Sequence, residues 1–223
     1  MDKIKINSYI DHTILKPEST YDQVIQICEE AKKYHFASVC VNSGFASLVS
    51  KQLKGSNVKT GIVIGFPLGV CSTETKVCEV KDAIKNGAKE VDMVINVGAL
   101  KSGDLGCVEK DIAAVIAAAN KKVLVKVILE TCLLTKDEIV TVCKIAKKAG
   151  ADFVKTSTGF NAAGATVEHI KLMRQTVGDK MGIKASGEIK TLQTALDMIK
   201  AGATRIGCSS SVKIMQELEE KKM

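Results

Sequence analysis

The chain has 223 residues, of which 46% are hydrophobic and 26% charged, and it contains no Trp. This length is enough to bury a large core, and no change in composition marks a linker, so residues 1–223 are predicted to form one domain with an aliphatic core. The formal net charge of +7 permits an anionic partner, but the lysines form dispersed pairs without a basic stripe among aromatic residues. This pattern argues against nucleic-acid binding and suits a phosphorylated small molecule.

Signals for a membrane location or a metal site are weak. The first 15 residues contain no apolar run of signal-peptide length, and no segment approaches the roughly 18 apolar residues of a membrane span. The eight cysteines show no C-x-x-C spacing, and the three histidines are scattered. We therefore expect a cytoplasmic protein with reduced cysteines, without membrane contact, metal or cofactor.

The predicted elements alternate between strands and helices in chain order. A short strand-like stretch, YIDHTIL (9–15), precedes a helix over 20–34 that begins with a capping box of Thr20 and Gln23. Apolar runs predict further strands over 37–41, 58–64, 123–130 and 182–186. Helices are expected over 73–85, 105–120, from 135, over 167–176, over 192–200 and from 211.

Three segments repeat one pattern of a basic helix end, a glycine and a strand: AIKNGAKEVD (83–92), AKKAGADFVK (146–155) and MIKAGATRIG (198–207). With these, eight strands alternate with helices. This order predicts an α/β fold, a single-domain (β/α)8 TIM barrel with an extra N-terminal helix, whose reactive groups lie at the C-terminal ends of the strands. A doubly wound open sheet is the alternative, although no G-x-G-x-x-G motif follows a strand.

Lys155 interrupts the short apolar strand in DFVKTSTGF (152–160). Lysine is almost never fully buried without a partner, so this side chain is either compensated by a neighbouring charge or partly neutral and reactive. A second strand lysine, Lys184, favours reactivity, because two ammonium groups facing one cavity lower each other's proton affinity. A lysine with a lowered pKa is a nucleophile toward carbonyl compounds. The alternative for one lysine alone is a strand-end side chain that extends to solvent.

By alternation, five charged side chains face the barrel interior near strand ends: Asp92, Lys126, Glu130, Lys155 and Lys184. An ion-pair network that fills the barrel is one explanation. The loops favour a ligand site, because Gly187 follows the seventh strand and residues 207–210 (Gly-Cys-Ser-Ser) follow the eighth. Barrels often present backbone N–H groups to a phosphate there. The combination predicts a site for a phosphorylated carbonyl compound.

Eight motifs occur in an order that spans nearly the whole chain: IDHT (10–13), FASVCVN (36–42), GFPLG (65–69), EVDMVIN (90–96), LVKVILET (124–131), ADFVKTSTGF (151–160), KASG (184–187) and ATRIG (203–207). In this order they resemble the deoxyribose-phosphate aldolases, a class I (Schiff-base) family. The resemblance implies a lyase that reversibly cleaves 2-deoxy-D-ribose 5-phosphate to D-glyceraldehyde 3-phosphate and acetaldehyde in deoxynucleoside catabolism. It also implies a homodimer.

The resemblance implies roles for single residues. Lys155 would form the Schiff base, Lys184 would lower its pKa and assist proton transfer, and Asp92 would act as general acid or base through water. The residues expected to bind the substrate are Asp11, Thr13, Lys126 and Thr158. The residues expected to contact the phosphate are Gly159, Gly187, Ser209 and Ser210.

Two departures from the family pattern leave alternatives open. Glu188 stands where the family has a glycine, so a left-handed backbone would be strained there and the carboxylate would weaken phosphate binding. Alternatively, its side chain points to solvent and only its N–H matters. The chain also has no tyrosine after Tyr34, whereas family members often carry one in a mobile tail. The rival functions are a Schiff-base aldolase with altered substrate preference and a catalytically silent barrel that binds a sugar phosphate.

Overall fold

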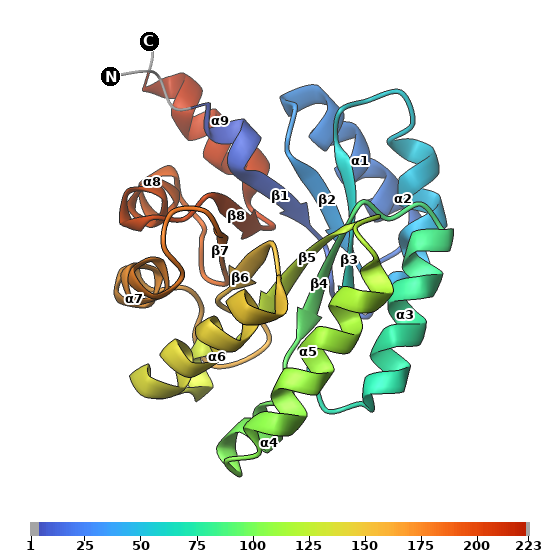
Figure 1. Cartoon of the computed structure of the whole chain (residues 1–223). Helices are drawn as coiled ribbons and strands as arrows, with labels where there is room; N and C mark the ends of the chain where they lie inside the picture. The colour runs from blue at the N-terminus through green and yellow to red at the C-terminus, as the bar shows by residue number, and fades with distance from the viewer. Residues whose placement is uncertain (1–4, 222–223) are drawn as a thin grey trace.

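The computed structural model describes residues 5–221, in which eight parallel strands form a closed barrel (Figure 1). Each strand pairs with the next in the chain, and β8 pairs with β1 to close the barrel. The strands are β1 (Ile10–Thr13), β2 (Ser38–Val41), β3 (Lys59–Ile64), β4 (Glu90–Val94), β5 (Leu124–Ile128), β6 (Phe153–Lys155), β7 (Gly182–Ser186) and β8 (Arg205–Cys208). The predicted (β/α)8 barrel is confirmed.

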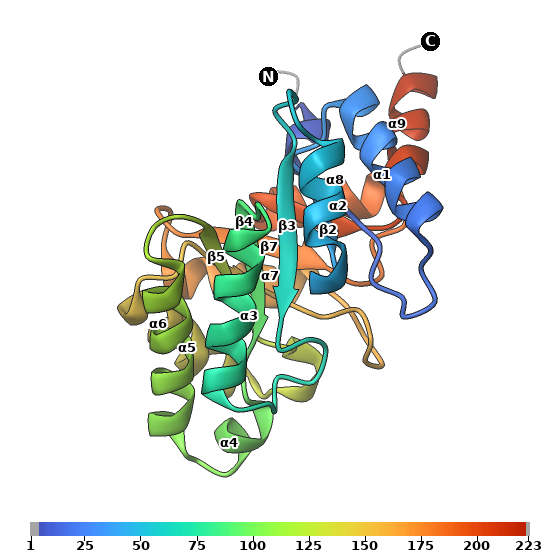
Figure 2. The same cartoon turned by 90° about the vertical axis from the view of Figure 1, so that its right-hand side faces the viewer.

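The helices surround the barrel (Figures 1 and 2). They are α1 (Tyr21–Tyr34), α2 (Ala46–Gln52), α3 (Thr73–Lys85), α4 (Val97–Lys101), α5 (Leu105–Ala119), α6 (Lys136–Ala149), α7 (Val167–Val177), α8 (Leu192–Ala201) and α9 (Ser211–Glu220). Short 3-10 helices are η1 (Ile6–Tyr9), η2 (Ser43–Phe45) and η3 (Thr131–Leu133). In the described part of the chain, the extra N-terminal helix is the short 3-10 helix η1, which precedes β1.

The local sequence sets where several helices begin and end. The side chain of Thr20 accepts a hydrogen bond from the Gln23 N–H, and the Gln23 side chain accepts one from the Thr20 N–H, which confirms the predicted capping box. Thr135 and Glu138 form the same arrangement at α6. The glycine that follows the helix in each of the three repeated segments has a positive φ: Gly87 (95°), Gly150 (89°) and Gly202 (119°). A side chain is rarely stable in this conformation, so glycine ends these helices.

The main core lies between the strands and the helices and is aliphatic. Outward-facing strand residues such as Val39, Val127 and Ile183 are fully buried there, and each contributes about 1.5–3 kcal/mol to stability. One ion pair is also enclosed in this layer, because Lys76 of α3 contacts Asp111 of α5 with both side chains almost completely buried. Over residues 5–221, no helix has both the length and the apolar character needed to cross a membrane.

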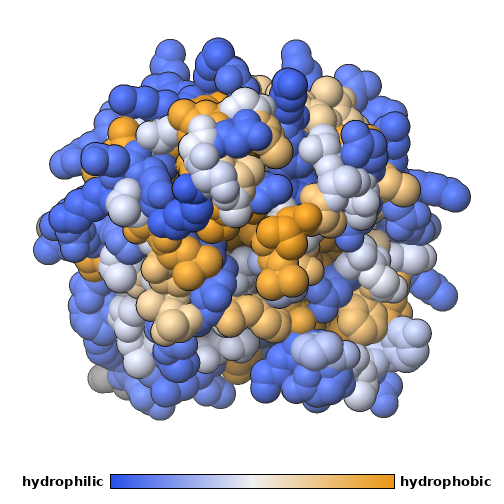
Figure 3. All heavy atoms as spheres, turned by 90° about the horizontal axis from the view of Figure 1, so that it is seen from below, coloured by the Kyte–Doolittle hydropathy of each residue, from blue (hydrophilic) through white to orange (hydrophobic). Residues whose placement is uncertain are grey.

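The strands end at one face of the molecule. The arrowheads of β4 in Figure 1 and of β3 in Figure 2 point toward the side that Figure 3 shows from below. Apolar side chains gather on this face (Figure 3). The exposed large apolar residues of the described chain lie in segments that follow strands, namely Tyr21, Leu68, Val70, Leu105, Leu133 and Phe160. These segments surround the mouth of the barrel.

Candidate active site

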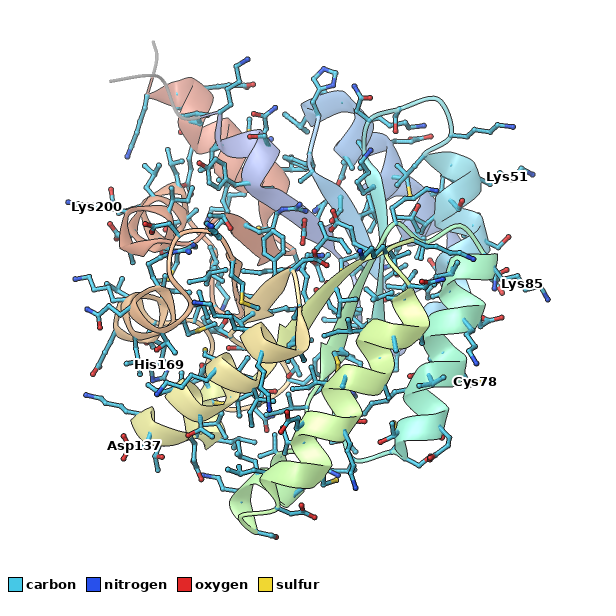
Figure 4. All side chains as sticks on the ribbon, viewed as in Figure 1. Lys51, Cys78, Lys85, Asp137, His169 and Lys200 are labelled. Atoms are coloured by element: carbon cyan, nitrogen blue, oxygen red, sulfur yellow. The ribbon has the colours of Figure 1, made fainter. Side chains whose placement is uncertain are left out.

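Lys155 is the last residue of β6 and its side chain is enclosed by the barrel. It is 2% exposed, and its Nζ donates a hydrogen bond to Oδ2 of Asp92 at 2.9 Å. In contrast, Lys51, Lys85 and Lys200 project from the outer helices into solvent (Figure 4). Lys155 is therefore one of the few buried lysines of the described chain, with Lys76, Lys126 and Lys184, and an enclosed ammonium group requires a paired charge.

Asp92 is the centre of the buried cluster. Its Oδ2 accepts from Lys155 and also from Lys184 at 2.7 Å, while its Oδ1 accepts from Lys126 at 2.8 Å. The strand register explains this arrangement, because Asp92 pairs with Lys126 across β4 and β5, and Lys155 pairs with Lys184 across β6 and β7. Three predicted lysines, from β5, β6 and β7, thus meet on the carboxylate of Asp92 in β4.

A second layer of ion pairs lies beneath this cluster. Lys184 Nζ is 2.5 Å from Oδ2 of Asp11, and Lys126 donates to Glu90 at 2.6 Å. Arg205 contacts both carboxylates, at 2.5 Å from Asp11 and 3.1 Å from Glu90. The ion-pair network considered as an alternative therefore exists, and it supports the lysine cluster from below.

Two members of this lower layer, Glu90 and Arg205, were not identified from the sequence. The available signal was alternation, since Glu90 lies two residues before Asp92 and shares its face of β4. The ring of Phe153 fills the same end of the barrel, with the Arg205 Cζ 5.6 Å from the ring centroid. Charges and an aromatic ring thus occupy the barrel where its strands begin.

The pKa values of the two central lysines shift in opposite directions. Burial lowers the pKa of Lys155, and the ammonium of Lys184 lowers it further against the opposing effect of Asp92. Burial would also lower the pKa of Lys184, but Asp11 and Asp92 together raise it well above its usual value. The expectation that the two lysines lower each other's proton affinity is therefore correct for Lys155 and wrong for Lys184, because Asp11 compensates only Lys184.

The carboxylates of the cluster remain ionised. Burial alone would raise the pKa of Asp92, but Lys126, Lys155 and Lys184 hold it well below its usual range. Asp11 is affected in the same way, with its pKa lowered by Lys184, Lys126 and Arg205 against the effect of burial. Within residues 5–221, no group of three or more His, Cys, Asp or Glu side chains is placed to hold a metal ion.

A cavity of about 630 Å³ opens above Lys155 at the C-terminal ends of the strands. Among the predicted site residues, its walls contain Thr13, Lys155, Thr158, Gly159, Gly187 and Ser209. Asp11 and Lys126 lie below the cavity, and Ser210 is the N-cap residue of α9 behind its wall. A second hollow, of about 710 Å³, lies beside the loops that precede β5 and β6 and contains no predicted site residue.

Comparison with known proteins agrees with this geometry. The model of the DeoC/LacD family of aldolases matches residues 5–217. The chain belongs to this family. A deoxyribose-phosphate aldolase from Clostridium novyi (strain NT) is 60% identical to this aldolase over 213 residues, which cover 96% of each chain.

Solved structures of related proteins have the same fold. A putative deoxyribose-phosphate aldolase from Coccidioides immitis superposes with a TM-score of 0.94 at 44% identity, covering 96% of this chain and 86% of that one. A deoxyribose phosphate aldolase from Aeropyrum pernix, described as having a unique tetrameric structure, gives a TM-score of 0.90 at 30% identity, covering 97% and 92%. This aldolase therefore has the same barrel fold as these relatives.

The loops after β6 and β7 approach closely at the cavity rim of this aldolase. A Cβ atom added to Gly164 would lie 2.2 Å from the Gly187 carbonyl carbon, so the two backbones are in contact. Gly187 has φ 82°, and Glu188 follows with φ 59°. Glu188 therefore adopts the left-handed conformation, one of the two alternatives left open by the sequence, which costs a residue with a Cβ about 1–2 kcal/mol. Its exposed carboxylate contacts Lys190 at 2.7 Å.

Glu130 does not face the lysine cluster, so this prediction was wrong. β5 ends at Ile128, and Glu130 adopts φ 60°, which breaks the alternation of faces. Its buried carboxylate instead accepts hydrogen bonds from the backbone N–H and Oγ1 of Thr158, at 3.2 and 2.5 Å, and from Nδ2 of Asn161 at 2.9 Å. Glu130 thus fixes the loop that follows Lys155.

Proposed function

We propose that this aldolase cleaves 2-deoxy-D-ribose 5-phosphate to D-glyceraldehyde 3-phosphate and acetaldehyde through a Schiff base on Lys155, and that it also catalyses the reverse addition. The observation that carries the proposal is the enclosed Lys155 beside Asp92 and Lys184 at the base of a cavity. The lowered pKa of Lys155 supplies the neutral amine that the reaction needs. The names of the relatives supply the substrate.

The chemistry proceeds in three steps. The Lys155 amine attacks the C1 aldehyde of the open-chain sugar, and loss of water leaves a protonated imine. Removal of the proton from the 3-hydroxyl then breaks the C2–C3 bond, whose electrons move toward the imine, and glyceraldehyde 3-phosphate leaves. The remaining enamine takes a proton at C2, and hydrolysis of the imine releases acetaldehyde and restores the amine.

The residues around Lys155 have separate tasks in this proposal. Lys184 remains an ammonium group, which keeps Lys155 uncharged and provides a proton beside the reacting carbons. Asp92 accepts hydrogen bonds from both lysines, so a proton released by one can reach the other through Oδ2. With a water molecule between it and the substrate, Asp92 acts as general acid and base. Asp11 and Lys126, which lie outside the cavity, hold Lys184 and Asp92 in place.

The substrate occupies the cavity with its phosphate toward the rim. The hydroxyls of Thr13 and Thr158 line the wall and are available to the sugar. Backbone groups of Gly159, Gly187 and Ser209, together with the N-terminus of α9 behind Ser210, receive the phosphate. The distance along the cavity from the lysine to the rim separates the reacting aldehyde from the charged end of the substrate.

Reductive trapping tests the proposal. Acetaldehyde and borohydride should add one ethyl group to the protein, and peptide mapping should locate it on Lys155. Lys155→Leu should lose both the adduct and the cleavage of deoxyribose 5-phosphate, while Lys200→Leu, at an exposed lysine of α8, should retain both. A barrel that only binds a sugar phosphate would form no adduct, which would refute the proposal.

A comparison of substrates tests the rival with altered preference. Glu188 favours this rival, because its carboxylate lies at the rim where the phosphate would bind. The proposal requires a higher kcat/KM for deoxyribose 5-phosphate than for deoxyribose, and the opposite ranking would support the rival. The homodimer, the cytoplasmic location and the role in deoxynucleoside catabolism are also proposals, and sedimentation of the purified protein would decide the first.

A further inference from the structure

His12 is the one polar residue of the IDHT motif that has no role in the reaction described above, although it lies between Asp11 and Thr13. It is 2% exposed, and its imidazole points away from the lysine cluster, toward the outer helices. Its Nε2 lies 2.7 Å from Oε2 of Glu30 in α1, and its Nδ1 lies 2.9 Å from Oγ of Ser211 in α9. A single side chain on β1 thus joins two helices that flank the cavity.

Ser211 continues this connection into the turn between β8 and α9. Its Oγ lies 3.1 Å from the carbonyl oxygen of Cys208 and 3.3 Å from the Cys208 thiol. Cys208 ends β8 and Ser211 begins α9, so these contacts enclose the two residues between them, Ser209 and Ser210. Strand pairing places the same turn beside β1, because His12 is in register with Cys208. His12 and Ser211 therefore help to hold the turn that carries the proposed phosphate contacts.

The tautomer of His12 and the proton of the Cys208 thiol set the direction of the hydrogen-bond chain. The carboxylate of Glu30 only accepts hydrogen bonds, so His12 Nε2 carries a proton. Burial lowers the pKa of His12 against the effect of Glu30, so the imidazole is neutral and Nδ1 is an acceptor for the Ser211 hydroxyl, whose single proton is shared between Nδ1 and the Cys208 carbonyl oxygen. Burial raises the pKa of the Cys208 thiol to about 11, so this thiol keeps its proton and donates to Ser211 Oγ. Donors and acceptors thus alternate from β8 through α9 and β1 to α1.

We propose that His12 is a positioning residue for the substrate phosphate, holding the Ser209–Ser210 turn and the start of α9 at the cavity rim through Ser211. This inference rests on the proposed function, since it concerns the phosphate of the same substrate. His12 acts on binding of the charged end and leaves the chemistry at Lys155 unaffected, because its side chain lies on the opposite face of β1 from Asp11 and the lysines.

Substitution of His12 with glutamine or asparagine tests its two hydrogen bonds one at a time. The amide of His12→Gln reaches the position of Nε2 and keeps the contact with Glu30, but it loses the contact with Ser211. The amide of His12→Asn reaches the position of Nδ1 and keeps the contact with Ser211. His12→Gln should raise KM for deoxyribose 5-phosphate about fivefold, the ratio that corresponds to one ordinary hydrogen bond. Ser211→Ala also loses the contacts with Cys208, so it should raise KM by at least the same factor. His12→Asn should stay close to the unmodified protein.

Two further measurements identify the phosphate as the affected group. Inorganic phosphate, used as a competitive inhibitor, should bind more weakly to His12→Gln by the same factor, while kcat for the phosphorylated sugar and kcat/KM for unphosphorylated deoxyribose should not change. His12→Gln combined with Ser211→Ala should show no more loss than Ser211→Ala alone, because Ser211→Ala already removes the contact with His12. Equal losses on both substrates, additive losses or unchanged phosphate inhibition would each overturn the proposal.

Failure of the His12 proposal can be distinguished from failure of the proposed function. If the unmodified protein forms no borohydride adduct on Lys155 and cleaves neither sugar, the proposed function fails. If that protein is active and trapped on Lys155 while His12→Gln and Ser211→Ala bind phosphate normally, only the role of His12 fails. Ser211→Ala removes a single buried oxygen and changes little volume, so it tests the proposal even where a His12 variant does not fold.

Discussion

Replacing Lys184 with methionine tests whether its ammonium keeps Lys155 uncharged. Methionine is similar in length and removes the charge. Both lysine nitrogens contact Oδ2 of Asp92, at 2.9 Å for Lys155 and 2.7 Å for Lys184, so they are at most about 5.6 Å apart. At an effective dielectric constant of about 20, two unit charges at this distance repel each other by about 3 kcal/mol.

This repulsion corresponds to about two pH units in the pKa of Lys155. Loss of Lys184 also leaves the carboxylate of Asp92 with one partner fewer, which favours the ammonium form of Lys155 as well. Both effects have the same sign, so the pKa of Lys155 rises in Lys184→Met. Because only the neutral amine attacks the aldehyde, kcat/KM falls as the pH drops below this pKa. The kcat/KM of the variant therefore reaches its plateau about two pH units higher than that of the unmodified protein.

The measurement is the pH dependence of kcat/KM for deoxyribose 5-phosphate. Lys184→Arg retains the positive charge, so its acid limb, the fall of kcat/KM toward low pH, should lie near that of the unmodified protein even if its rate is lower. Lys213→Met removes an exposed lysine of α9 and controls for net charge. An acid limb in Lys184→Met that stays in place or moves to lower pH would contradict this explanation of the reactivity of Lys155.

Three further substitutions test other parts of the structure. Glu188→Gly should lower KM for the phosphorylated sugar about twofold to threefold, because a carboxylate is removed from the rim whose charge Lys190 already offsets in part. Glu130→Gln should reduce stability by about 2 kcal/mol, since an amide cannot accept every hydrogen bond that Thr158 and its loop donate. Asp111→Asn should reduce stability by about 3 kcal/mol and leave kcat unchanged, because it removes the charge paired with an enclosed lysine that does not line the cavity.

Each of these has a direct check. Glu188→Gln removes the charge but keeps the Cβ, so a KM equal to that of Glu188→Gly assigns the effect to charge, and an unchanged KM in both variants would refute interference by Glu188. Denaturant unfolding measures the other two substitutions. A Glu130→Gln protein as stable as the unmodified one, or an Asp111→Asn protein with a much lower kcat, would contradict the roles assigned here.

Much of the fold follows from local sequence, and the structure shows why. The helices over 20–34 and 73–85 were predicted to within one residue, because Thr20 and Ser72 cap them and a regular apolar face runs between their ends. The short helices α2 and α4, with seven and five residues, were missed, since they contain too few turns to show a period.

The candidate site was predictable wherever alternation along a strand holds. Asp92, Lys126 and Lys184 face the interior because each lies within a regular strand. Glu130 lies beyond the end of its strand in a left-handed conformation, which no residue pattern indicated. The raised pKa of Lys184 depends on Asp11, which is distant in the chain and becomes a neighbour only when β8 pairs with β1. Contacts that form only when the barrel closes cannot be predicted from the local sequence.

The side chains that fill the barrel below the lysines determine the order in which products leave and substrates bind. Arg205, Glu90 and Phe153 occupy the end where the strands begin, so substrate and products use the same entrance. The two-carbon fragment is bonded to Lys155 at the closed end, and the three-carbon phosphate stands between it and the solvent. Glyceraldehyde 3-phosphate therefore departs first and acetaldehyde last, and in the synthetic direction acetaldehyde is the first of the two to bind.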